Sequence, residues 1–109
     1  MANTENTKVV ENTEEVKDTV LELRKPIEIN GELTKEIPYD LESLTGNDVS
    51  DAIKMLASRG IMVTLTETDS NYHAAIFAIS AGLDFSDIQN LGAKDYQKAC
   101  NTVRDFFLE

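Results

Sequence analysis

The sequence predicts a small, mostly helical α+β protein in which an N-terminal β-hairpin packs on a C-terminal bundle of three to four helices. Apolar residues alternate with charged residues from about position 20 to position 39, as they do in strands. From about position 48 onward the apolar residues recur at helical spacing instead. Residues 69–82 are apolar on nearly every side, which predicts a central helix that the other elements enclose.

Length and charge limit the classes of protein that this chain can represent. Its 109 residues suffice for one domain with one hydrophobic core. The formal net charge of −10 would repel nucleic-acid phosphates and anionic membranes, so we expect neither as a partner. No stretch approaches the roughly 18 consecutive apolar residues of a membrane span. The single cysteine, Cys100, cannot form an internal disulfide, so we expect a cytoplasmic protein.

The first residues of the chain differ in composition from the rest. Residues 1–19 are rich in Asn, Thr, Glu and Lys, and their only sizeable apolar residues are Val9, Val10 and Val16. Such a segment lacks the apolar surface that would offset the entropy of ordering it. We therefore expect a flexible acidic tail followed by a single domain at residues 20–109, with a helix that forms only on binding as the alternative for the tail.

The predicted hairpin turns at Asn30-Gly31, a pair of residues that favours tight turns. A two-residue turn at this point would scatter the apolar residues over both faces of the hairpin. A three-residue loop with Gly31 in the left-handed conformation places them on one face, and we expect this register. The expected cross-strand pairs are Ile27 with Leu33, Leu23 with Ile37, and Leu21 with Tyr39.

A helix is predicted at about residues 48–58, with Asn47 or Asp48 as its N-cap and Gly60 as its stop. Its apolar residues at helical spacing are Val49, Ala52, Ile53, Leu56 and Ala57. The β-branched and apolar stretch at residues 61–66 fits either a third strand or an irregular buried connection. We favour the extended strand for this stretch.

The central helix follows, with Asp69 as the expected N-cap and Gly82 as a left-handed C-terminal residue. Leu83 would fold back against the helix end in a Schellman motif. The residues from Ser86 to Gln89 have the form of a capping box, which predicts a short helical turn that closes near Leu91-Gly92.

The last helix is predicted from about Ala93 to Leu108. Its inward residues at helical spacing are Tyr96, Ala99, Cys100, Val103, Phe106 and Phe107. Its polar face is expected to carry Lys94, Asp95, Gln97, Lys98, Arg104 and Asp105. Neighbouring residues on a helix point about 100° apart, so we expect one of the two terminal phenylalanines to remain available for contact with a partner.

The sequence lacks the converging reactive groups of an enzyme. His73 is the only histidine, and we expect it at the edge of the core rather than in the role of a base. Cys100 lies on the inward face of the last helix, where a small buried apolar residue is expected. We therefore predict no catalytic residue and no cofactor-binding residue.

Two acidic pairs, one at positions 48 and 51 and one at positions 84 and 87, are candidates for a carboxylate dyad or a cation site. Both pairs lie at predicted helix starts, where the helix dipole favours acidic residues. Neither pair has the ligand spacing of a calcium loop. We therefore predict no metal-binding residue.

Several short motifs occur in an order and spacing that resemble one protein family. They are Leu23-Arg-Lys-Pro26-Ile27-Glu-Ile-Asn-Gly31, Leu44-Thr-Gly46-Asn-Asp48, Asp69, Ala74-Ala75, Gly82-Leu83, Asp87-Ile88-x-x-Leu91-x-x-x-Asp95-Tyr96 and Val103-x-x-Phe106. Together they cover residues 21–108, and the chain resembles the tail assembly chaperones of long-tailed bacteriophages, small proteins encoded beside the tape-measure protein.

This resemblance implies a non-enzymatic chaperone that keeps the tape-measure protein soluble until tail-tube subunits polymerise around it. Such a protein works in the cytoplasm of the bacterial host and is absent from the mature virion. The family also implies that a longer form, made by ribosomal frameshifting, recruits the tail-tube protein. We expect the client to bind the last two helices, with Ile88, Leu91, Tyr96, Phe106 and Phe107 as candidate contact residues.

Two other classes of binding protein stay open at this point. The chain could be a structural or adaptor protein of the virion, in the tail or at the head–tail connector. It could also be a small acidic regulator that mimics nucleic acid, although many of its carboxylates lie in the tail or at helix starts rather than on one rigid face. The sequence leaves the oligomeric state open as well.

Overall fold

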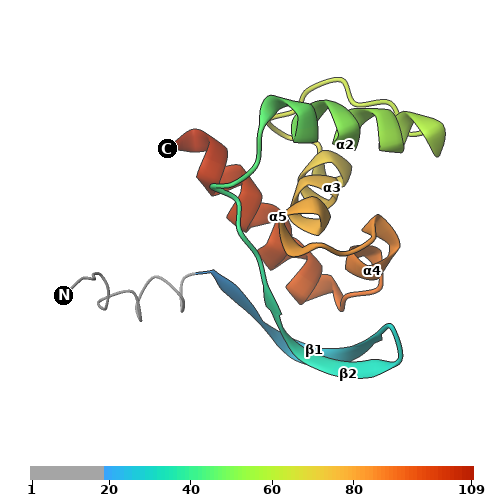
Figure 1. The fold of residues 1–109 in the computed structure, drawn as a ribbon, viewed down its shortest axis with the longest axis vertical. Coiled ribbons are helices and arrows are strands. Elements are labelled where there is room, and N and C mark those ends of the chain that lie inside the picture. Colours follow the sequence, from blue (N-terminus) through green and yellow to red (C-terminus); the bar gives the residue numbers. More distant parts are fainter. Residues whose placement is uncertain (1–18) are drawn as a thin grey trace.

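The computed structural model describes residues 19–109 as a two-stranded antiparallel hairpin followed by four helices. These elements are β1 (Val20–Ile29), β2 (Glu32–Pro38), α2 (Gly46–Ser58), α3 (Ser70–Ala81), α4 (Phe85–Gln89) and α5 (Ala93–Leu108). Figure 1 shows the helices grouped around α3, with the hairpin at one end of the group. The predicted α+β class is confirmed. The tail predicted at residues 1–19 lies outside the described residues, apart from Thr19.

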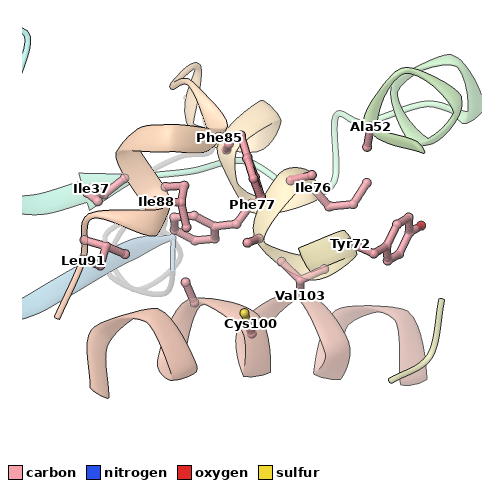
Figure 2. Close-up of a cluster of buried hydrophobic side chains, with 14 of the residues drawn as sticks. Ile37, Ala52, Tyr72, Ile76, Phe77, Phe85, Ile88, Leu91, Cys100 and Val103 are labelled. Carbon is pink, nitrogen blue, oxygen red and sulfur yellow. The ribbon is translucent and has the colours of Figure 1, made fainter. Parts of the chain in front are cut away.

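Helix α3 is the centre of the core, as its apolar composition predicted. Every residue from Tyr72 to Ala78 is buried, and α2, α4 and α5 all pack against this helix. Figure 2 shows its side chains among those of the surrounding elements, including Ala52 of α2, Ile88 of α4 and Val103 of α5. Because α3 has no solvated side, the other helices are placed by the need to cover it.

Both ends of α3 have the predicted caps. The Asp69 carboxylate accepts a hydrogen bond from the Tyr72 backbone N–H at 3.1 Å. At the other end Gly82 has a φ of 69°, and the Leu83 N–H donates to the Ala78 carbonyl at 2.9 Å. This is the bond of a Schellman motif, and it needs a left-handed residue at Gly82.

The starts of α2 and α4 differ from the prediction by two or three residues. Thr45 precedes α2, and its N–H donates to the Asp48 carboxylate at 2.8 Å, so neither Asn47 nor Asp48 is the N-cap. Asp84 is the N-cap of α4, and its N–H donates to the Asp87 carboxylate at 3.1 Å. In both helices the acidic residue lies in the first turn and reaches back to the cap, which is the geometry of a capping box.

The stretch at residues 61–66 is not a strand but an irregular connection, in which Ile61 and Val63 are partly buried against the core. It leaves α2 after Gly60, where the chain has a φ of 81°, and returns irregularly towards Asp69. Met62 is 84% exposed. Within residues 19–109 the strands β1 and β2 pair only with each other, so this apolar segment adds no third strand to the sheet.

The predicted register of the hairpin is wrong. Asn30 and Gly31 have φ values of 54° and 84°, the signature of a two-residue type I′ turn, and Ile29 pairs with Glu32. The expected pairs of Ile27 with Leu33, Leu23 with Ile37 and Leu21 with Tyr39 are therefore absent. Ile27 pairs with Thr34 instead, Glu28 with Leu33, and Leu21 with Ile37.

The pairing of the two strands is interrupted by an irregular segment of β1. Between Glu22 and Ile27 the register shifts, so that residues 23–26 of β1 lie opposite position 35 of β2. This bulge leaves β1 backbone groups without partners in the ladder. Leu21 and Ile37, which pair beyond the bulge, and Ile29 beside the turn are all buried.

Asp95 of α5 binds the bulge of β1. The Arg24 N–H donates to both carboxylate oxygens of Asp95, at 3.0 and 3.1 Å, and the Lys25 N–H donates to Oδ2 at 3.1 Å. The Lys98 ammonium adds a bond to the Glu22 carbonyl at 3.1 Å. Asp95 is only 1% exposed, so its expected place on the polar face of the helix is wrong. Its carboxylate joins the hairpin to the helices.

Two opposing effects act on the Asp95 carboxyl. Burial by itself would raise its pKa, but the N–H donors of Arg24 and Lys25 and the charge of Lys98 outweigh burial, and the pKa lies below its ordinary value. A lowered pKa stabilises the folded protein above the ordinary carboxyl pKa of about 4, and this contribution is lost as the pH falls through the folded pKa.

We predict that Asp95→Asn lowers the free energy of unfolding by about 2 kcal/mol at pH 7, because charged hydrogen bonds to two backbone donors are weakened. Urea titrations at several pH values measure this loss, and the difference from the wild type should shrink below a pH of about 4. Asp105→Asn, an exposed change on the same helix, is the control. Equal losses in the two variants, or a pH-independent difference, would contradict the role of Asp95.

Candidate partner-binding surface

His73 is enclosed by the fold. It is buried in the first turn of α3, and its ring lies edge-on to Tyr72 with the centroids 5.7 Å apart. Burial lowers the pKa of this histidine, and a hydrogen bond with the Thr66 backbone opposes that effect in part. A neutral, packed imidazole at this position serves the core, in keeping with the sequence prediction of a core-edge histidine.

Cys100 is buried against the start of α3. Its thiol donates a weak hydrogen bond to the Ser70 carbonyl, with sulfur and oxygen 3.5 Å apart. Burial raises the pKa of this thiol, which keeps it in the less nucleophilic protonated form. The placement agrees with the prediction that Cys100 acts as a small apolar residue.

We predict that Cys100 in the folded protein reacts with a chromogenic disulfide reagent only through unfolding, because both burial and its raised pKa suppress the thiolate. The rate at pH 8 should rise steeply in urea across the unfolding transition. A fast reaction in the absence of denaturant would show that α3 and α5 separate readily.

Three of the four acidic residues predicted at helix starts, Asp48, Asp84 and Asp87, accept hydrogen bonds from backbone N–H groups at the starts of α2 and α4. Residues 19–109 contain no group of three or more His, Cys, Asp or Glu side chains that could hold a metal ion. No helix in the same part of the chain is long and apolar enough to cross a membrane.

The five candidate contact residues divide into buried and accessible ones. Ile88 of α4 is fully buried against α3, and Leu91 is buried as well, so both belong to the core rather than to a surface that a partner could reach. Tyr96 is half-buried, and its hydroxyl donates to the Ser70 carbonyl at 3.4 Å. Phe106 is also half-buried, whereas Phe107 is 46% exposed.

Phe106, Phe107 and Leu108 form what we call the C-terminal surface. The ring of Phe107 lies 5.3 Å from that of Phe106 and 6.3 Å from that of Tyr72, between centroids. Leu108, at the end of α5, is 68% exposed. Large apolar residues that gather at an exposed helix end are typical of a contact surface.

A second apolar surface escaped the sequence analysis. Ile53 and Ala57 on the outer side of α2, with Ile61, Met62 and Val63 of the following loop, line a depression of about 250 Å³. The run at residues 61–66 contained the signal, because its apolar residues have no helical period and directly follow a helix stop. Interpreting it as a strand hid its exposure.

Comparisons with protein-family models, with curated proteins and with solved structures found no match to this chain. Its function therefore has to be argued from its own residues and their arrangement.

We predict that Ile88→Ala lowers the free energy of unfolding by about 2–5 kcal/mol, as large-to-small changes in a core do. Phe107→Ala should cost less than about 1 kcal/mol, because much of its ring already faces solvent. Urea unfolding of both variants, followed by circular dichroism, separates the core role from the surface role. Equal losses would place Phe107 in the core as well.

Proposed function

We propose that this protein is a non-enzymatic chaperone of phage tail assembly that binds the tape-measure protein and keeps it soluble until the tail tube polymerises. The observation that carries the proposal is the C-terminal surface. Phe107 and Leu108 are exposed at the end of α5 and do not belong to the hydrophobic cluster around α3. A protein that works by contact needs accessible apolar side chains of this kind.

The order of the sequence motifs supports the same function. Gly46 and Asp48 lie at the start of α2, Asp69 and Gly82 cap α3, and Asp95 binds the hairpin. These matched positions are mostly determinants of the fold, so the resemblance to tail assembly chaperones does not identify the binding face.

The chemistry of the chain suits a client that consists of long amphipathic helices. The apolar stripe of such a helix can dock on exposed apolar residues, here Phe107 and Leu108. The net charge of −10 would keep a client covered by several copies in solution, because neighbouring complexes repel one another. Within this proposal, the protein acts in the host cytoplasm and leaves before the virion is mature, and a longer frameshifted form recruits the tail-tube protein.

Co-expression with the tape-measure-like protein encoded beside this chain tests the proposal. We expect the client to become soluble and to co-purify with this protein. Phe107→Asp combined with Leu108→Asp should abolish both effects, because charges would replace the apolar contact. Leu33→Asp is the matched control, since Leu33 is also exposed and apolar but lies in the hairpin.

Circular dichroism of each variant verifies that the fold is intact before binding is compared. A client that stays insoluble with the wild-type protein would contradict the chaperone function. Discovery of this protein in purified mature particles would favour a structural or adaptor role in the virion instead.

A further inference from the structure

A second feature at the same end of α5 is a groove with acidic edges. It lies between the last turns of α5 and the connection from β2 to α2, which run beside each other in Figure 1. Tyr39, Leu41 and Phe106 contribute apolar side chains to its lining, and its volume is about 370 Å³. The carboxylates of Asp40, Glu42, Asp105 and Glu109 also line it. We call this feature the acidic groove.

The wall of the groove is attached to the core. The Asp40 N–H donates to the Ser80 carbonyl of α3 at 2.9 Å, and the Tyr39 N–H donates to the Thr19 carbonyl at the same distance. The ring of Tyr39 lies 5.1 Å from that of Phe77, between centroids. Because these contacts hold the connection against α3, the groove exists before any partner arrives, and binding costs little ordering.

The charge of the groove is uncompensated by its own lining. No Lys, Arg or His is among the lining residues. The ion pair found within residues 19–109 joins Arg59 and Asp84, which do not line the groove. Four carboxylates around an apolar floor create a local negative potential that favours a positively charged partner with an apolar side chain to bury.

Two occupants from the chain itself fit less well. Residues 1–18 join the domain next to Thr19, but they carry five acidic residues and two lysines, so the carboxylates of the groove would repel them. A second copy could present Arg24, Lys25 and Lys94, which line a separate pocket at the start of α5. The other lining residues of that pocket are Gly92, Ala93 and Asp95, which offer no large apolar side chain for the floor.

We propose that the acidic groove binds an amphipathic helix that carries lysine and arginine, with an apolar side chain on the floor and basic side chains at the carboxylates. Docking of a helix on a groove through apolar anchors is an established mode of recognition. The chemistry of this helix follows from the groove alone. Its assignment to the tape-measure client rests on the function proposed above.

The test uses the full chain and a labelled model peptide with leucines along one face and lysines on the other. Fluorescence anisotropy measures its affinity near physiological salt. One control peptide replaces the lysines with glutamates, and another scrambles the order so that the apolar stripe is lost. We expect the first peptide to bind and both controls to bind at least about tenfold more weakly, since the groove selects charge and shape together.

Matched charge changes in the protein locate the site. Glu42→Lys combined with Asp105→Lys should weaken binding of the lysine peptide by about tenfold or more. Glu28→Lys combined with Asp51→Lys alters the net charge equally at exposed positions outside the groove, and should weaken binding far less. Chemical-shift changes in labelled protein should centre on Thr102, Asp105 and Phe106.

Three outcomes would overturn the proposal. Equal weakening by the two charge pairs would reduce the binding to general attraction by an acidic protein. Equal binding of the scrambled peptide would remove the role of the apolar floor. The protein could also self-associate in a concentration-dependent way. If this association is lost both in the Glu42→Lys/Asp105→Lys variant and in the Arg24→Glu/Lys94→Glu variant, a second copy of the chain is the occupant of the groove.

Experiments can contradict the proposed groove and the proposed chaperone function independently of each other. If the lysine peptide binds the groove but the client is not solubilised, the groove chemistry stands and the chaperone function falls. If the Glu42→Lys/Asp105→Lys variant solubilises the client as well as the wild-type protein does, the chaperone function stands and the acidic groove is not its client site.

Discussion

The enclosure of α3 is the constraint from which the rest of the structure follows. A helix that is buried from Tyr72 to Ala78 must be covered on every side, and α2, α4 and α5 supply that cover. The hairpin is attached mainly through α5, where the buried Asp95 carboxylate accepts the N–H groups that the bulge of β1 leaves outside the ladder. The bulge of β1 therefore supplies hydrogen-bond donors to the buried Asp95 carboxylate, and the carboxylate supplies acceptors for the N–H groups of the bulge.

Among the described residues, the large apolar side chains that lie outside the core are informative. Apart from Leu33 in the hairpin, they gather at the end of α5, in Phe107 and Leu108, and along α2 and its following loop, around Met62. The end of α5 combines this apolar surface with the acidic groove, in which Phe106 and Asp105 take part. A partner that lies along this end of the molecule would meet apolar anchors and carboxylates together, which favours an amphipathic helix with basic residues.

The sequence predicted those parts of the fold that depend on local patterns. The full length of α5 and both caps of α3 follow from helical spacing and from the chemistry of Asp69 and Gly82, and they appear as predicted. The errors lie where tertiary contacts decide. The register of the hairpin includes a bulge whose N–H groups are bound by the distant Asp95, and a carboxylate among polar neighbours gave no local sign that it would be buried. Likewise, Ile88, Leu91 and Phe107 are all large apolar residues of predicted helices, so the sequence does not distinguish them. Only the packing of the helices shows that Ile88 and Leu91 lie in the core and that Phe107 is exposed.

Hydrogen–deuterium exchange of the protein alone and in complex with its client tests the central claim, that a partner is bound at the C-terminal end of α5, most directly. The account predicts slower exchange at residues 39–42 and 102–109 in the complex, with little change at the tip of the hairpin. In the protein without its client, the backbone amides of Ile88 and Leu91 should already be protected from exchange, because these residues lie in the folded core. Protection confined to the hairpin tip or to the loop around Met62, or faster exchange in α4 as the client binds, would contradict the account.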